Sequence, residues 1–159
     1  MGAKAEALAK QFEAKAQEVM AVLEKLSDAD WKKVTAAEKW SVAVTAHHVA
    51  TAHDPIANIV KTLAAGQSIP HFTTSMLEEL NAKHAKEFAN VSKAETIALY
   101  KKSVAAAAAL VRSLGDEQLG KSGTVFADSP PMSAQQMITN ALIGHIEEHF
   151  ESIRKTVRA

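Results

Sequence analysis

Apolar residues recur at helical spacing along most of the chain. From about residue 4 to residue 26, leucine, phenylalanine and valine stand three, four or seven positions apart, with lysine and glutamate between them. This spacing predicts an amphipathic helix. The stretch Leu-Ser-Asp-Ala-Asp-Trp at 26–31 ends that helix, and we expect a short helical turn to begin at Ser27 or Asp28.

A second helix is predicted after a short connector. Ser41 has the residue type of an N-cap, and the apolar pattern that follows continues to about Gly66. Pro55 lies inside this segment and removes one backbone hydrogen bond, which predicts a kink near His53.

Three later helices are predicted from their first turns. A serine followed three residues later by Glu or Gln is the pattern of a capping box. Such pairs predict helices over about 75–89, over about 92–114, and from 133 to near the end of the chain; a stiff Ser-Pro-Pro-Met loop at 129–132 precedes the last helix. The pairs are Ser75 with Glu78, Ser92 with Glu95, and Ser133 with Gln136.

Composition agrees with this helical pattern. Alanine is abundant along the chain, whereas the 159 residues include only 6 glycines and 4 prolines. Alternating β-branched residues are rare, so the predicted fold class is all-α. A chain of this length is enough for one domain with its own core, and we expect residues 1–159 to form it.

Charge and cysteine usage exclude several classes of function. Eighteen basic residues balance 18 acidic ones, and the signs are interspersed, which argues against binding nucleic acid or a membrane surface. The chain has no cysteine, so disulfides and thiolate metal sites are excluded. Neither a transmembrane-length apolar run nor a signal-peptide core is present, and we expect a soluble cytoplasmic protein.

Two histidines near the C-terminus are the strongest chemical signal. His145 and His149 are four residues apart, which stacks them on one face of a helix. At about 100° per residue, the apolar positions Ile146 and Ile153 fall on the same face. Buried imidazoles need partners, and a metal ion fits this spacing well. The alternative is a histidine pair that is satisfied by Asn, Thr or water.

An open metal site needs a third protein ligand. On the second predicted helix, His48 and His53 flank the apolar stripe on opposite sides, and periodicity leaves them as equal candidates. His47 points about 100° away from His48. His84 also faces inward by its spacing, and the loop residue His71 has no assigned role.

A ten-residue motif carries a resemblance to a known family. The stretch Trp-Ser-Val-Ala-Val-Thr-Ala-His-His-Val at 40–49 resembles the Trp-Ser/Thr-x6-His-Leu signature of the DinB-like superfamily. The signature places its histidine eight residues after Trp40, which selects His48, and the family's His-x-x-x-His pair matches His145 and His149. This chain departs from the signature by a valine after the histidine and by the additional His47.

The resemblance implies a four-helix bundle with a long connector between the early helices and a loop before the last helix. It also implies a divalent metal ion, zinc or nickel, held by three histidines. Characterised members include thiol-dependent transferases and isomerases that use a low-molecular-weight thiol, as well as hydrolases acting on small molecules, and homodimers are common. We therefore expect a metal-dependent enzyme with a small-molecule substrate. Candidate residues that line the pocket or hydrogen-bond the metal ligands are His53, Asp54, Asn81 and His84.

Two other functions fit parts of the sequence. Residues 145–149 read His-Ile-Glu-Glu-His, the inverted zinc-peptidase motif, in which Glu148 would be the general base. However, Glu148 falls on the charged edge of the helix, and a small bundle offers no evident peptide cleft. The second alternative is a non-catalytic bundle that binds a small molecule or holds a purely structural metal ion.

Overall fold

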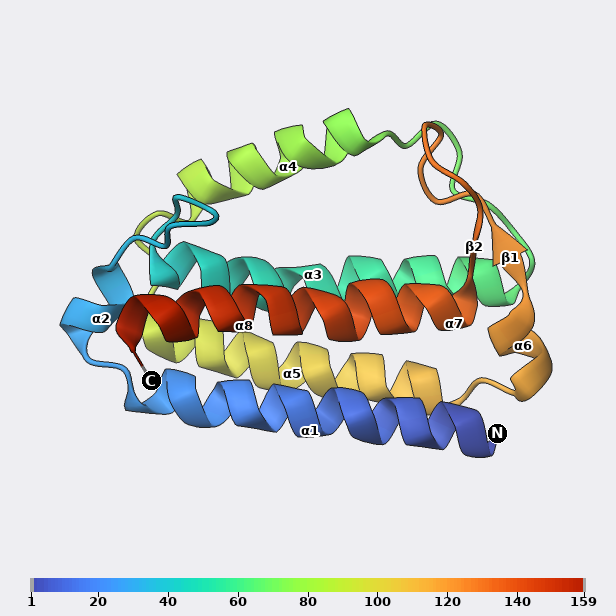
Figure 1. Ribbon diagram of the computed structural model, residues 1–159, viewed down its shortest axis with the longest axis horizontal. Coiled ribbons are helices and arrows are strands. Elements are labelled where there is room, and N and C mark those ends of the chain that lie inside the picture. Colours follow the sequence, from blue (N-terminus) through green and yellow to red (C-terminus); the bar gives the residue numbers. More distant parts are fainter. Residues whose placement is uncertain (1, 159) are drawn as a thin grey trace.

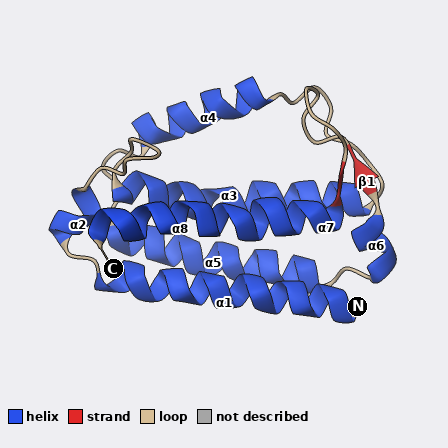
Figure 2. Ribbon diagram, in the orientation of Figure 1, coloured by secondary structure: helices blue, strands red, loops and turns tan. Residues whose placement is uncertain are grey.

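The computed structural model describes residues 2–158, and most of them are helical (Figure 2). Four long helical segments lie side by side and form a bundle (Figure 1). They are α1 (Ala3–Lys25), α3 (Val42–Ala64), α5 (Lys93–Arg112) and the C-terminal segment that ends in α8 (Gly144–Val157). The predicted all-α, four-helix bundle is confirmed.

The order of the helices follows from one long connection. α4 (Thr74–Glu87) lies outside the bundle and carries the chain back from the end of α3 to the start of α5 (Figure 1). As a result α3 and α5 run in the same direction, while α1 and α8 run in the opposite direction. Two short helices, α2 (Asp28–Lys32) and α6 (Asp116–Gly120), lie at opposite ends of the bundle.

Side-chain caps explain where the helices begin. The hydroxyls of Ser27, Ser41, Ser92 and Ser133 each accept a hydrogen bond from a backbone N–H in the first turn, as their positions predict. The capping box predicted at Ser75 is wrong. α4 begins one residue earlier, because the hydroxyl of Thr73 already accepts the backbone N–H of Met76.

The bundle core is built from one face of each long helix. On α1 the buried positions are spaced alternately by four and three residues, which keeps them in one stripe. Burying an aromatic side chain such as Phe12, which is 0% exposed, stabilises the fold by about 1.5–3 kcal/mol. The buried positions of α1 are Ala5, Ala9, Phe12, Ala16, Val19 and Leu23.

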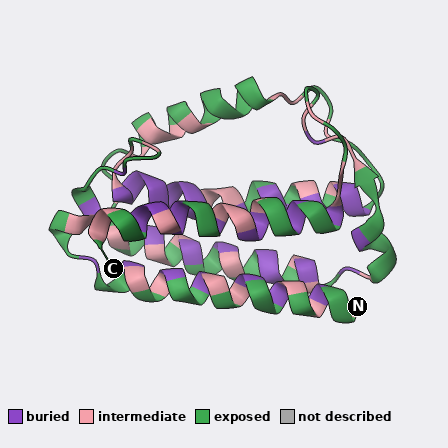
Figure 3. Ribbon diagram, viewed as in Figure 1, coloured by how far each residue is buried: buried purple, intermediate pink, exposed green. Residues whose placement is uncertain are grey.

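α4 differs from the bundle helices in its burial. None of its described residues is buried, and Met76, Leu77 and Leu80 are exposed (Figure 3). Its ends are tied down. Thr74 donates its backbone N–H and its hydroxyl to the Asp128 carboxylate, while the other end contacts α3 through His84. α4 is therefore an arch that is supported at both ends.

The last helical segment is not the regular helix that its sequence predicts. α7 (Ala134–Met137) leads into a π-helical segment, η1 (Ile138–Ile143), and then into α8. In η1 the backbone N–H of Gly144 bonds the carbonyl of Thr139, five residues back. A π turn takes one more residue than an α turn, so the rotational phase of α8 differs from that of an uninterrupted α-helix.

A two-stranded hairpin closes the end of the bundle near α6. β1 (Ser122–Gly123) pairs antiparallel with β2 (Met132–Ser133). A side chain at Gly123 would place its Cβ 2.3 Å from the carbonyl oxygen of Gln67, so glycine is required there. Among residues 2–158, none of the helices has both the length and the apolarity needed to cross a membrane.

Candidate metal centre

Three histidine side chains from two helices meet in the bundle. His48 comes from α3, and His145 and His149 stand one turn apart on α8. The Nε2 atom of His145 lies 2.9 Å from Nε2 of His48 and 3.1 Å from Nε2 of His149. One ring nitrogen of each residue falls within 4.8 Å of the other two. The structure thus brings together the three residues that the family signature selects.

Hydrogen bonding cannot satisfy these three nitrogens at once. A neutral imidazole has one N–H and one lone pair. The Nδ1 atom of His149 faces the Glu38 carboxylate at 2.6 Å, so it carries the proton and leaves Nε2 with a lone pair. A single proton on His145 Nε2 would then have to serve both His48 and His149. A metal ion satisfies all three lone pairs, and tetrahedral ligands about 2.05 Å from zinc stand about 3.3 Å apart, close to the spacing here.

A carboxylate that the sequence analysis missed supports this cluster. Glu38 accepts hydrogen bonds from His149 Nδ1 through Oε2 and from the Ser152 hydroxyl through Oε1. Burial alone would raise the pKa of Glu38, but hydrogen bonds from Ser152, His149 and Thr35 outweigh it and hold the pKa below its usual value. A charged carboxylate on the outer nitrogen of a ligand histidine fixes its orientation and raises its basicity.

The connector between α2 and α3 delivers Glu38 to the cluster. Backbone hydrogen bonds from Thr35 N to Trp40 O (2.8 Å) and from Val42 N to Lys33 O (2.7 Å) close this connector into a tight loop. Lys39 takes a left-handed conformation with φ of 62° to make the turn. The sequence signal for Glu38 is therefore its position two residues before Trp40. Hydrophobic periodicity does not reveal the shape of the loop in which Glu38 lies.

Burial keeps His48 and His145 neutral at pH 7, because it lowers the pKa of both imidazoles. Burial, together with repulsion from His149 and other histidines, lowers the pKa of His48 to about 4. The same two causes lower the pKa of His145 to about 2. Neutral imidazoles are the form that binds a metal ion. His145 is half-buried as a residue, whereas His48 and His149 are buried, and the Nδ1 atom of His145 is itself buried.

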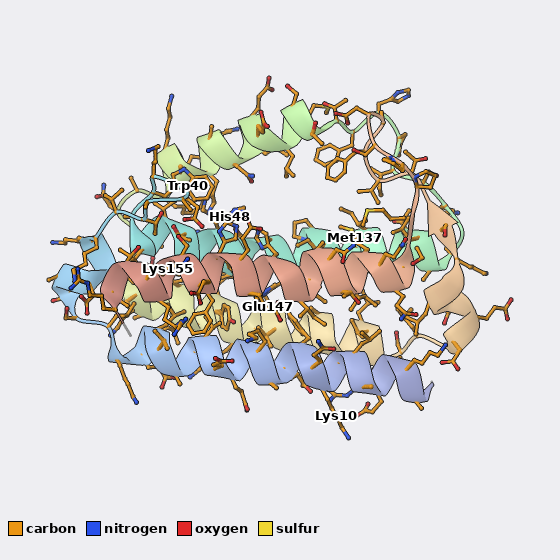
Figure 4. The ribbon with its side chains drawn as sticks, viewed as in Figure 1. Lys10, Trp40, His48, Met137, Glu147 and Lys155 are labelled. Atoms are coloured by element: carbon orange, nitrogen blue, oxygen red, sulfur yellow. The ribbon has the colours of Figure 1, made fainter. Side chains whose placement is uncertain are left out.

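His48 also contacts aromatic groups on the side of α3 that faces α4. Figure 4 shows Trp40 beside His48, between the bundle and the C-terminal end of α4. The two rings meet edge to face with centroids 5.2 Å apart. The tryptophan of the signature therefore packs directly against the histidine that the signature selects.

His53, the alternative that periodicity left open, lies deeper in the core. It is 1% exposed, and its Nδ1 atom is 2.9 Å from the Ser103 hydroxyl on α5. Its ring packs against Phe12 and Tyr100, with centroids 5.3 and 5.5 Å away. It is not one of the three converging residues. The neighbouring Asp54 is exposed, and among residues 2–158 it makes no hydrogen bond or ion pair with the histidines.

A second pair of histidines lies next to the cluster and joins α4 to α3. His47 Nδ1 is 2.8 Å from His84 Nε2, and the rings are stacked with centroids 5.0 Å apart. Phe88 packs on both of them. His84 thus faces inward as predicted, but its partner is His47. Asn81, one turn earlier on α4, is half-buried and makes no side-chain hydrogen bond to another described residue.

The inverted zinc-peptidase motif has no general base at this site. Glu148 is exposed on α8, while His145 and His149 face the bundle. Glu147, labelled in Figure 4, is exposed as well. The two glutamates of the motif therefore point away from the histidine cluster.

Comparisons with known proteins agree with this architecture. A model of the DinB superfamily matches residues 11–153. No curated protein matches the sequence. Two crystal structures of the mycothiol-dependent maleylpyruvate isomerase, one of them a mutant, superpose with TM-scores of 0.73 and 0.75 at 14% and 13% identity. These matches cover 94% of this chain, which spans 60% of the isomerase.

A third structure matches over more of its own length. YfiT from Bacillus subtilis, described as a probable metal-dependent hydrolase with an unusual four-helix bundle topology, superposes with a TM-score of 0.73 at 18% identity. The match covers 98% of this chain and 85% of YfiT. At these identities the likeness establishes the fold alone.

Proposed function

This chain belongs to the DinB superfamily, and from that premise we propose that it is a metal-dependent enzyme whose divalent ion is held by His48, His145 and His149. The observation that carries the proposal is the convergence of three Nε2 atoms whose lone pairs cannot all be satisfied by hydrogen bonds within the cluster. Glu38 adds support, because it sets the tautomer that aims the His149 lone pair inward.

The donor set suits zinc or nickel. Three imidazoles without a thiolate ligand are typical of open catalytic sites, in which a fourth position stays free for a small molecule. When bound, such an ion lowers the pKa of a thiol or water at that position and so supplies a nucleophile at neutral pH.

The nucleophile has to come from outside the chain. The protein contains no cysteine, and none of the histidines in the cluster contacts a serine that could act as a nucleophile, since Ser152 is bonded to Glu38. We propose a low-molecular-weight thiol as the leading candidate, with transfer of the thiol to a small electrophile as the reaction. The comparison with an isomerase that depends on mycothiol supports this choice.

Hydrolysis by water is the second candidate. The probable metal-dependent hydrolase among the matched structures supports it, and the same three ligands would serve. A bundle that binds a small molecule without reaction, or that holds a structural metal ion, is the non-enzymatic alternative. Cobalt substitution separates these cases, because absorption of an open site changes when a thiol is added and that of a closed four-ligand site does not.

The first test is elemental analysis of protein purified without added metal. We expect about one divalent ion per chain, as in other single-site metalloproteins. The second test mixes metal-loaded protein with bacillithiol, mycothiol or glutathione and a panel of epoxides and activated alkenes. Thiol loss faster than with the His145→Ala variant supports transfer. Electrophile loss without thiol supports hydrolysis, and rates equal to those of the variant count against both.

A further inference from the structure

The N-terminal half of α4 faces the bundle without being covered by it. His84 and Phe88 both contact His47 of α3, so they define the side of α4 that faces the bundle. At about 100° per residue, Leu77 falls between these two residues in rotational phase. Leu77 is nevertheless 36% exposed, and Leu80, at the edge of the same face, is 56% exposed. The bundle therefore covers this face of α4 only near its C-terminal end.

The side of α3 that faces α4 is uncovered as well. Thr51 lies between His47 and His48 in rotational phase, and Asn58 lies within about 20° of His47. Thr51 is half-buried, while Pro55 and Asn58 are exposed. Two faces that point toward each other and stay accessible are not joined by packed side chains. We call them the arch surface; its residues are Leu77, Leu80 and Asn81 on α4, and Thr51, Pro55 and Asn58 on α3.

The arch surface is largely apolar and carries no charged side chain. Its apolar part consists of two leucines and a proline, and the hydroxyl of Thr51 already donates to the carbonyl oxygen of His48 at 3.0 Å. Two amides, those of Asn58 and Asn81, remain as polar groups. The charged side chains of α4 are at least about 80° from Leu77 in rotational phase; they are Glu78, Glu79, Lys83, Lys86 and Glu87.

The charges beside the arch surface disfavour an anion near the cluster. On α3, the exposed Asp54 lies within about 20° of His47 in rotational phase. Lys61 lies on the same side, but it is fourteen residues beyond His47, or about 21 Å along the helix. Lys83, next to His84, forms an ion pair with Glu87. A small anion held close to His48 would therefore lie near a carboxylate and far from the free lysine of α3.

Both walls of the arch surface lead to the candidate metal centre. The ring of His84 meets the ring of His48 edge to face, with centroids 5.7 Å apart. Asn81 is one helical turn before His84, and Thr51 is one turn after His48, so each wall begins beside the cluster. The surface is continuous with the position at which a substrate has to react.

The way in which α4 is held limits the size of what can bind. One end is tied by His84 to His47, and the other by Thr74 to Asp128 (Figure 1). A face that looks at its own bundle beneath a helix fixed at both ends is closed to the flat surface of a folded partner. A small molecule can enter from the side.

We propose that the arch surface binds the apolar body of a small uncharged electrophile and directs its reacting carbon toward the cluster; this substrate class rests on the proposed function. The leucines and Pro55 contact the apolar body, and the amide of Asn81 offers one hydrogen bond. With an epoxide, the thiol sulfur bonds a ring carbon as the carbon–oxygen bond breaks, and the thiol proton ends on the alcohol oxygen.

The first experiment measures binding without any reaction. N-phenyl-1-naphthylamine is an uncharged fluorescent probe, and 8-anilinonaphthalene-1-sulfonate has the same aromatic body with one added negative charge. We expect the purified chain to bind the uncharged probe at least about tenfold more tightly, because the sulfonate finds no cation to pair with. Equal affinities, tighter binding of the sulfonate, or no binding of the uncharged probe would overturn the proposal.

Two substitutions on α4 locate the bound probe. Leu77→Asp places a charge on the arch surface, and Met76→Asp makes the same change of charge at an exposed position about 100° away. We expect Leu77→Asp to weaken binding of the uncharged probe about tenfold or more, and Met76→Asp to leave it within about threefold of wild type. Equal affinities in the two variants would place the probe elsewhere and overturn the proposal. Neither side chain is buried, so both variants should fold, which circular dichroism checks.

The second experiment uses the zinc-loaded protein with a thiol and two epoxides. We expect styrene oxide, which is apolar and uncharged, to be preferred to the dianion epoxysuccinate. In Leu77→Asp the KM for styrene oxide should rise about tenfold while kcat changes less, since the substitution affects binding. A preference for epoxysuccinate would overturn the proposal. If neither epoxide reacts faster than with His145→Ala, the proposed transfer fails, while the probe measurements still decide whether the arch surface binds an uncharged apolar molecule.

Discussion

Two groups of histidines share α3 and differ in how their nitrogens are satisfied. His47 and His48 are adjacent, so their side chains leave the helix about 100° apart and meet different partners. His47 meets His84 of α4, where one proton lies between His47 Nδ1 and His84 Nε2, while the other ring nitrogen of His84, Nδ1, is buried without a partner among residues 2–158. His48 meets His145 and His149, where one proton would have to serve three nitrogens.

The difference shows how a structural histidine pair can be told from a ligand set. Both groups lie in partly buried surroundings and both include a histidine with a lowered pKa. Only the cluster has more lone pairs than protons to fill them, and only the cluster has a carboxylate, Glu38, on the outer nitrogen of one member. The count of protons and lone pairs therefore distinguishes the candidate metal site from the His47–His84 pair, and neither burial nor proximity does so alone.

The largest expected effect is the loss of metal affinity when a cluster histidine is replaced, and it distinguishes the cluster from the His47–His84 pair. Replacing His145 by alanine removes one of three proposed ligands, so we expect the affinity for zinc or nickel to fall by more than about 100-fold, which exceeds the effect of removing a group that only supports a ligand. His47→Ala is the matched control, because it removes an imidazole from the same region without touching the cluster. Similar losses in both variants, measured by chelator competition, would show that the two groups do not differ in this way.

The next effect concerns the carboxylate that only the cluster has. Glu38→Gln removes the charge that holds His149 while keeping the size of the side chain. We expect the metal affinity to drop about 10-fold to 100-fold. Glu151→Gln is the matched control in the same assay. It makes the same change of charge, but Glu151 pairs with Arg154 on the surface of α8. An unchanged affinity in Glu38→Gln would argue against a supporting role for Glu38.

A third prediction uses pH to test the buried neutral histidines. The pKa of His53 is about 4 in the folded protein and about 6.5 when unfolded, so the unfolded chain binds the proton first as pH falls. The stabilisation is therefore present above pH 6.5 and is lost on acidification, by about 2 kcal/mol between pH 7 and pH 5. Urea unfolding of metal-free protein at these two pH values measures it.

The His53→Gln variant isolates the part of this loss that belongs to His53. His48 and His145 also have lowered pKa values and remain in the variant, so its stability should still fall with pH, but by less than that of the wild type. Identical pH dependence in wild type and variant would mean that His53 does not stay neutral in the core.

The smallest effect is expected at the His47–His84 pair. His84→Ala breaks the bond that holds the C-terminal end of α4 to α3, while Thr74 and Asp128 still hold the other end. Because α4 has no buried residues, we expect faster amide hydrogen exchange confined to α4, with metal affinity within about threefold of wild type. Faster exchange throughout the bundle would show that α4 contributes to the stability of the core.

Much of the fold could be predicted from local pattern. Periodicity located the long helices, and serine caps located most of their starts, because both depend on residues close in sequence. The cap of α4 was misplaced, since Thr73, Thr74 and Ser75 all have suitable hydroxyls and the contact of Thr74 with Asp128, 54 residues away, is not local. The π segment was also missed, because helical periodicity assumes 3.6 residues per turn throughout.

The candidate site, too, could be predicted from the sequence only where residues close in sequence determine it. His145 and His149 were identified from their spacing alone, since one turn of helix brings them together. Periodicity could not choose between His48 and His53, because both lie on flanks of the buried stripe; the family signature made the choice, and the structure brings His48 to the pair. Glu38 was found only in the structure, because its partner His149 on α8 is more than 100 residues away in the sequence.

The sequence by itself determined the helices, their apolar faces and the histidine pair on α8, because these depend on interactions within a few residues. Tertiary structure decided which histidine completes the cluster, which carboxylate supports it, and that His84 bonds His47 outside it. The physical reason is that the proton and lone-pair balance of a buried imidazole depends on groups from several helices, whose distances and orientations are set only when the helices pack.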